Sequence, residues 1–173
     1  MDNLCKNLIS TAAKGEYPPI QIAEPNPQYS QLLAIDLASA QSELTSIMQY
    51  IYQSWRLYGP YQKVGEVMEC IARVEMHHME ILGKLITLLG GNPKYMSVQH
   101  HCPTFWQADM VAYSGNLRQM IQEDIVLEQA AIDTYLRQCQ IIKDPYIQAI
   151  IQRIIEDEKV HLAIFHKYLT EVC

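Results

Sequence analysis

The sequence predicts one all-α domain, a four-helix bundle made of two antiparallel hairpins that a long crossover joins, with an N-terminal arm before it. Three observations predict this fold class. Four long segments carry apolar residues at spacings of three and four, which is one face of a helix. No segment shows sustained two-residue alternation, so no sheet is expected. Glycine and proline gather at the ends of the four segments, and 173 residues suffice for one sizeable core.

The arm is expected to comprise residues 1–29, and the bundle residues 30–173. Pro18, Pro19, Pro25 and Pro27 stand close together in the arm. Proline at this density is typical of extended chain that forms no helix. We therefore expect the arm to lie on the body of the bundle.

Helix-breaking residues delimit the four helices. The first is expected to stop at Gly59 and the second at Gly90, whereas Asp144 and Pro145 open the fourth as its N-cap and first turn. Short connections make each pair of helices an antiparallel hairpin. The connection over residues 91–112 is long enough, at ~3.3 Å per extended residue, to travel the ~40 Å length of a long helix. The predicted helices span residues 28–58, 62–89, 114–142 and 145–170.

Charge and cysteine content exclude several classes of function. The net charge is -6 and the Lys and Arg residues are scattered, which argues against nucleic acid or an anionic membrane as the main partner. Neither a signal peptide nor a membrane-spanning stretch is expected. Five cysteines without C-x-x-C spacing argue against a disulfide framework and against a zinc or rubredoxin-type site. A reducing cytoplasm is the expected compartment.

Each apolar stripe is interrupted by one glutamate, and on two helices a histidine follows one turn later. A lone buried carboxylate is costly, and two divalent cations would balance four of them. Carboxylate and imidazole suit iron and manganese, and this set is a known bundle solution for two metals. The stripes place no Lys or Arg beside the acids, so buried salt bridges are the weaker alternative. The candidate metal ligands are Glu43, Glu75, His78, Glu128, Glu158 and His161.

The two halves of the chain repeat this pattern. Glu43 and Glu128 lie 85 residues apart, and Glu75 and Glu158 lie 83 apart. In antiparallel hairpins these positions bring the glutamates of each hairpin to one level. The sequence therefore predicts a duplicated hairpin and a pseudo-twofold metal site.

From residue 28 to 171 the chain resembles the ferritin-like diiron carboxylate superfamily, nearest the rubrerythrin and bacterioferritin branch. The motifs are Glu43, Glu75-Met76-His77-His78, Asp124-Ile125-Val126-Leu127-Glu128 and Asp157-Glu158-Lys159-Val160-His161. The resemblance implies that Glu43 and Glu128 are terminal ligands, that Glu75 and Glu158 bridge two Fe or two Mn ions, and that each histidine binds one. It also implies that Tyr50 sits near the site.

The resemblance implies an oxidoreductase that acts on hydrogen peroxide or dioxygen, as in a rubrerythrin-like peroxidase with a separate electron donor. The chain departs from rubrerythrins because it has no rubredoxin-type module and has Ala131 where they have an extra glutamate. A manganese-catalase-like dismutase, a ferroxidase and a non-enzymatic metal-binding structural protein remain alternatives. Haem is not expected, since Met76, its conceivable ligand, is better explained by packing. A homodimer is the default assembly.

Several other residues are candidates for supporting roles. Asp124 is expected either to hydrogen-bond a ligand histidine or to end the polar part of its stripe. Tyr50 and Tyr135, each seven residues after a glutamate, either hydrogen-bond ligands, with Tyr50 a candidate catalytic residue, or serve packing. His100-His101-Cys102 is expected to be an ordinary loop rather than a soft metal site. Cys70 and Cys139 are expected to be packing residues.

Overall fold

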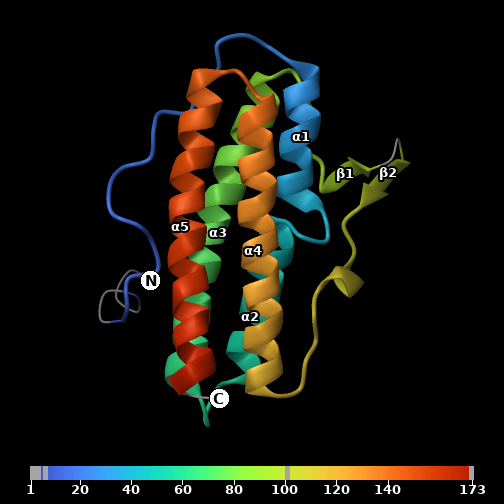
Figure 1. Ribbon diagram of the computed structural model, residues 1–173. Coiled ribbons are helices and arrows are strands. Elements are labelled where there is room, and N and C mark those ends of the chain that lie inside the picture. Colours follow the sequence, from blue (N-terminus) through green and yellow to red (C-terminus); the bar gives the residue numbers. More distant parts are fainter. Residues whose placement is uncertain (1–4, 6–7, 100–101, 172–173) are drawn as a thin grey trace.

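The computed structural model describes residue 5, residues 8–99 and residues 102–171 of the chain. The bundle consists of α2 and α3, which pack as one hairpin, and α4 and α5, which pack as the other, with α1 continuing the rod of α2 (Figure 1). This confirms the all-α four-helix bundle. The helices are α1 (Pro27–Ala38), α2 (Glu43–Arg56), α3 (Gln62–Leu88), α4 (Leu117–Ile141) and α5 (Pro145–Glu171).

The helix ends follow the capping residues that the sequence offers. Asp144 caps α5, because its Oδ1 accepts hydrogen bonds from the backbone N–H groups of Tyr146 and Ile147. Asn116 caps α4 in the same way through the N–H of Gln119. After α3, Gly90 has a φ of 87°, a left-handed conformation that glycine adopts without strain. The chain therefore turns where the sequence predicted.

The prediction of one continuous first helix is wrong, because the helical chain is interrupted at residues 39–42, between α1 and α2. Ser42 Oγ and Thr45 Oγ1 both donate to the carbonyl of Ser39, at 2.7 Å and 2.8 Å. Such side-chain bonds compete with the helical backbone pattern and end the helix locally. The interruption makes Glu43 the first residue of α2.

The sequence predicted a crossover without strands, but the crossover contains a small two-stranded sheet. It contains β1 (Met96–Gln99) and β2 (Cys102–Phe105), which pair antiparallel with Met96 opposite Phe105, followed by a 3-10 turn, Ala108–Met110. The hairpin projects beside α1 (Figure 1). Its second strand is exposed at all four residues, so it lacks the alternation that marks a half-buried strand. Cys102 lies in this strand and is exposed, whereas His100 and His101 lie outside the described residues.

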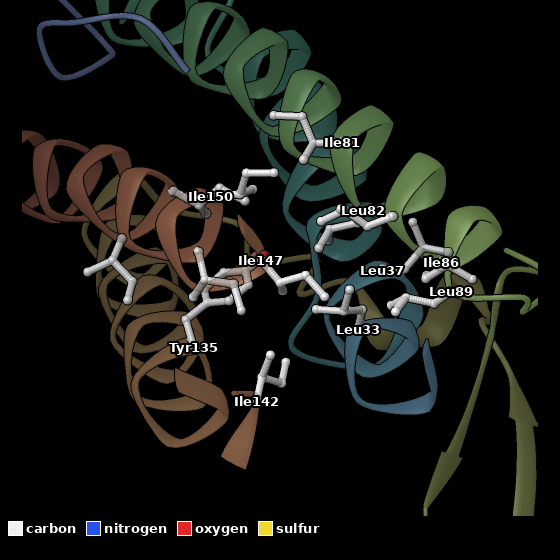
Figure 2. Packing of buried hydrophobic residues seen from close by; sticks show 14 of the residues in the cluster. Leu33, Leu37, Ile81, Leu82, Ile86, Leu89, Tyr135, Ile142, Ile147 and Ile150 are labelled. Atoms are coloured by element: carbon white, nitrogen blue, oxygen red, sulfur yellow. The ribbon is translucent and has the colours of Figure 1, made fainter. Parts of the chain in front are cut away.

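The hydrophobic core is divided into two clusters along the bundle. One lies around α1 and the adjoining ends of α3, α4 and α5, and includes Leu33, Leu82 and Ile147 (Figure 2). The other lies toward the opposite end and includes Met68, Ile121 and Phe165. On α3 and α5, the predicted ligands fall between the stretches of helix that contribute to the two clusters. The site is thus a polar layer with apolar packing on both sides.

A disulfide contradicts the expectation that the cysteines form none and that Cys70 only packs. Cys5 of the arm is bonded to Cys70 of α3, 65 residues later in the chain. Spacing alone could not reveal a pair so distant in sequence. Since disulfides persist mainly in oxidising compartments, the bond removes one argument for a reducing cytoplasm, which stays a prediction. None of the helices in the described part of the chain is long and apolar enough to cross a membrane.

Candidate metal centre

The six predicted ligands come together in the middle of the bundle. Glu43 opens α2, Glu128 lies on α4, and the two Glu-x-x-His pairs lie on α3 and α5. All six side chains are buried, none more than 4% exposed. Helical periodicity explains the convergence, because each residue occupies the core-facing stripe of its helix.

The six residues form two overlapping clusters that share Glu75 and Glu158. His78 Nδ1 lies 2.9 Å from Glu75 Oε2, 3.2 Å from Glu158 Oε1 and 3.5 Å from Glu43 Oε2. His161 Nδ1 lies 3.0 Å from Glu75 Oε1, 3.2 Å from Glu158 Oε2 and 3.6 Å from Glu128 Oε2. The two shared glutamates therefore contact both histidines, whereas Glu43 and Glu128 each contact one.

Two tyrosines repeat the same twofold relation. Tyr50 of α2 donates a hydrogen bond to Glu128 of α4, and Tyr135 of α4 donates one to Glu43 of α2. Both rings are fully buried, with at most 1% of their surface exposed. Each tyrosine thus holds the unshared glutamate of the other hairpin, so the two hairpins orient each other's glutamates.

The pKa values of the six groups shift in different directions. Burial, together with the charges of the two shared glutamates, raises the pKa values of Glu43 and Glu128 well above their usual range. Burial opposes protonation of His78 and His161, but the surrounding carboxylates outweigh it and raise both pKa values. In the shared glutamates the histidines reverse the effect of burial and lower the pKa. Glu43, Glu128 and the two histidines therefore hold a proton more readily than the free side chains do, whereas Glu75 and Glu158 release theirs more readily.

The donor set fits a pair of divalent cations. Glu75 Oε1 and Glu158 Oε1 are buried without a hydrogen-bond donor, although each lies within ion-pair distance of a histidine nitrogen. Unpaired carboxylate oxygens are costly in a core, and a bound cation would supply what they lack. Oxygen and imidazole nitrogen are suitable ligands for iron and manganese alike.

The structure also places Asp124 and Met76, for which the sequence left more than one role open. Asp124 Oδ1 accepts hydrogen bonds from the amide nitrogens of Gln49 and Gln53, both at 2.8 Å, and these partners are side chains of α2 rather than a histidine. Burial raises the pKa of Asp124 to about 7. Met76 is 45% exposed on α3, so core packing does not explain it.

Sequence analysis missed the groups behind the histidines. Asp157, a motif residue with no predicted role, lies 3.1 Å from His78 Nε2. Its spacing to Arg153, with which it forms a 2.6 Å ion pair on α5, was a usable signal. Tyr17 also reaches His78 Nε2, at 3.2 Å, and the carbonyl of Thr11 lies 2.8 Å from His161 Nε2. Nothing in the pattern of the proline-rich arm indicates these last two contacts.

Two relatives align with most of this chain. A probable manganese catalase of Clostridium acetobutylicum is 27% identical, over 88% of this chain and 75% of the relative. A bacterioferritin of Desulfovibrio desulfuricans is 32% identical, over 71% of this chain and 65% of the relative.

Solved structures agree with this fold. A manganese catalase from Anabaena PCC7120 superimposes with a TM-score of 0.82 at 23% identity, covering 93% of this chain and 80% of the other. The bacterioferritin of Desulfovibrio desulfuricans gives 0.71 at 25% identity, covering 84% and 80%. The Ferritin-like domain family matches residues 38–172, which include all six predicted ligands. The expected resemblance is confirmed, and the chain belongs to the ferritin-like domain family.

Proposed function

We propose that the chain binds two manganese or iron ions at the six residues of the metal centre and disproportionates hydrogen peroxide. The observation that carries this proposal is the pair of overlapping clusters, each with one histidine and one unshared glutamate, that share Glu75 and Glu158. The relative named a probable manganese catalase, which aligns with 88% of this chain, supports dismutation over a donor-dependent peroxidase. Manganese is the first choice of metal for the same reason.

The proposed reaction is balanced without another reactant. One peroxide molecule is oxidised to dioxygen and a second is reduced to two molecules of water, so two electrons and two protons pass between them. Held by the six residues, two metal ions would supply the two-electron redox couple. Tyr50 and Tyr135, which donate hydrogen bonds to Glu128 and Glu43, are the protein groups placed beside the ligands to pass protons.

A small cavity suits a substrate of this size. It has a volume of about 10 Å³ and lies between the α1–α2 interruption and α4. Its lining runs from the exposed Gln41 to the buried Glu43 and Glu158, and Ala131 forms part of it. A longer side chain at Ala131 would fill this space. The cavity thus has room for roughly one water-sized molecule, which excludes substrates much larger than hydrogen peroxide or dioxygen.

The test combines metal analysis with an oxygen electrode. Protein prepared with manganese and iron available should contain close to two metal ions per chain and should release dioxygen from peroxide with no reductant present. Glu75→Gln should lose metal and activity. Glu80→Gln, on the exposed face of the same helix, is the matched control and should keep both. Peroxide consumption that requires a reductant and releases no dioxygen would support the peroxidase instead, and a wild type without metal would refute the site.

Iron oxidation is the second candidate, because the relative with the higher identity, 32%, is a bacterioferritin. In that case Fe(II) is the substrate and dioxygen the oxidant. Rapid Fe(II) oxidation, with iron retained in a large assembly on size-exclusion chromatography, would favour this function. Slow oxidation by protein that releases dioxygen rapidly from peroxide would exclude it.

A further inference from the structure

The segment from Thr11 to Tyr17 lies against the outer side of the metal centre, although it belongs to the arm and not to the bundle. In Figure 1 the arm runs beside α5 and then passes over the end of the bundle to α1. Thr11 is 9% exposed, although residues 8–26 contain no helix or strand. Its contacts reach both histidines of the site.

His161 is held from behind by the backbone of this segment. Its Nδ1 faces the glutamates, while its Nε2 lies 2.8 Å from the carbonyl oxygen of Thr11. A carbonyl can only accept a hydrogen bond, so Nε2 must carry the proton. Nδ1 is then the nitrogen whose lone pair is available to a metal ion, and the ring cannot turn without losing this bond.

His78 is held from behind by a side-chain pair that the same segment completes. Its Nε2 lies 3.1 Å from Asp157 Oδ2. Tyr17 donates its hydroxyl hydrogen to the same oxygen, and the backbone N–H of Ala13 donates to Asp157 Oδ1 at 2.7 Å. The arm therefore fixes the carboxylate that fixes the histidine.

Arg153 of α5 holds this segment in place. Its Nη2 donates to the carbonyl of Ala13 at 3.0 Å, and its guanidinium lies 4.3 Å from the centre of the Tyr17 ring. Its Nη1 pairs with Asp157 Oδ1 at 2.6 Å. One buried arginine thus joins the arm to the residue behind His78.

We propose that residues Thr11–Tyr17 are a positioning element of the metal centre, which directs Nδ1 of both histidines toward the glutamates. The proposal rests on the proposed function, because the nitrogen atoms that this segment orients are the ones assigned to the metal ions. Partners of this kind change metal affinity about 10- to 100-fold when they are removed. The arm should therefore affect metal binding without contributing a ligand.

Two variants test the proposal through different atoms. Tyr17→Phe removes the hydroxyl that holds Asp157, and Arg153→Met releases the backbone of the segment. Tyr113→Phe is the matched control, because that hydroxyl donates to a backbone carbonyl in the crossover. The first readout is the dissociation constant for manganese(II) alone, measured by chelator competition. The second is solvent exchange of the imidazole Nε2–H protons, observed by NMR without metal.

Both variants should raise the dissociation constant about tenfold or more and speed imidazole N–H exchange at least about tenfold, with Tyr113→Phe unchanged in both. Arg153→Lys, which keeps the charge, should recover part of the loss. Dissociation constants within twofold of wild type, or unchanged exchange in both variants, would overturn the proposal. A wild type that binds no manganese would overturn the proposed function, whereas the exchange rates would still decide whether the arm holds the histidines.

Discussion

The Cys5–Cys70 disulfide offers a sharp test of how the arm is held. Replacing Cys5 with serine should lower the free energy of unfolding by about 4 kcal/mol, because the bond closes a loop of 65 residues and removes about 14 cal/mol/K of chain entropy from the unfolded state. Cys5 is the better position to change, since Cys70 is 1% exposed and a hydroxyl there would enter the core.

The assay is urea unfolding of chelator-treated protein followed by circular dichroism, so that no bound metal contributes. With a slope of about 2 kcal/mol/M, the midpoint should fall by about 2 M. Reduced wild type should behave as Cys5→Ser does. Cys102→Ser, at an exposed free cysteine, should keep the wild-type midpoint. A shift of less than about 0.5 M in Cys5→Ser would refute the entropic reasoning.

Four further outcomes follow from the site. Loading manganese should release protons, and the affinity for manganese should rise with pH, because four of the six groups have raised pKa values; calorimetry in buffers of different ionisation enthalpy measures the release. Burial raises the pKa of Asp36 to about 8, so the contribution of its protonated form to the free energy of unfolding is complete below pH about 4 and is lost as the pH rises through 8. In denaturation curves, Asp36→Asn should therefore be more stable than wild type by a few kcal/mol at pH 8 and equally stable at pH 4. Tyr50→Phe and Tyr135→Phe should each cost about 1–2 kcal/mol of stability, to a similar extent. Ala131→Leu should slow peroxide turnover severalfold at unchanged metal content, and an unchanged rate would contradict access through the cavity.

The helices and the convergence of the six ligands could be predicted because both depend on local periodicity. The spacing of three and four fixes which face of a helix is buried, and short connections fix which helices pair. Glu75 and His78, for example, share a face whatever the rest of the chain does. Two hairpins with the same pattern then leave little freedom in where the glutamates meet.

The interruption before Glu43 could not be predicted in this way. Apolar residues continue on both sides of it, and serine or threonine is tolerated inside many helices. The bonds of Ser42 and Thr45 to one carbonyl end the helix there. The sequence showed the residues, but the competition between them and the backbone depends on the packing around them.

The arm was the least predictable part, because its contacts are distant in sequence. Tyr17 and Asp157 are 140 residues apart, and Cys5 and Cys70 are 65 apart. The bond from His161 goes to a backbone carbonyl, which any residue at Thr11 would supply. No residue pattern can indicate such a partner, so the arm was expected to lie on the bundle but not to support the site.

The division of the core into two clusters explains how the fold can hold so costly a layer of buried acids. Apolar side chains pack on both sides of it, from Leu82 and Ile147 toward one end and from Ile121 and Phe165 toward the other. Hydrophobic burial therefore does not depend on the charged layer, which can exchange protons for cations while the helices stay in place. The raised pKa values of Glu43, Glu128 and the two histidines favour protons on this layer when no cation is bound. Protons and cations thus compete for the same buried groups, and either occupant lowers the cost of burying these carboxylates.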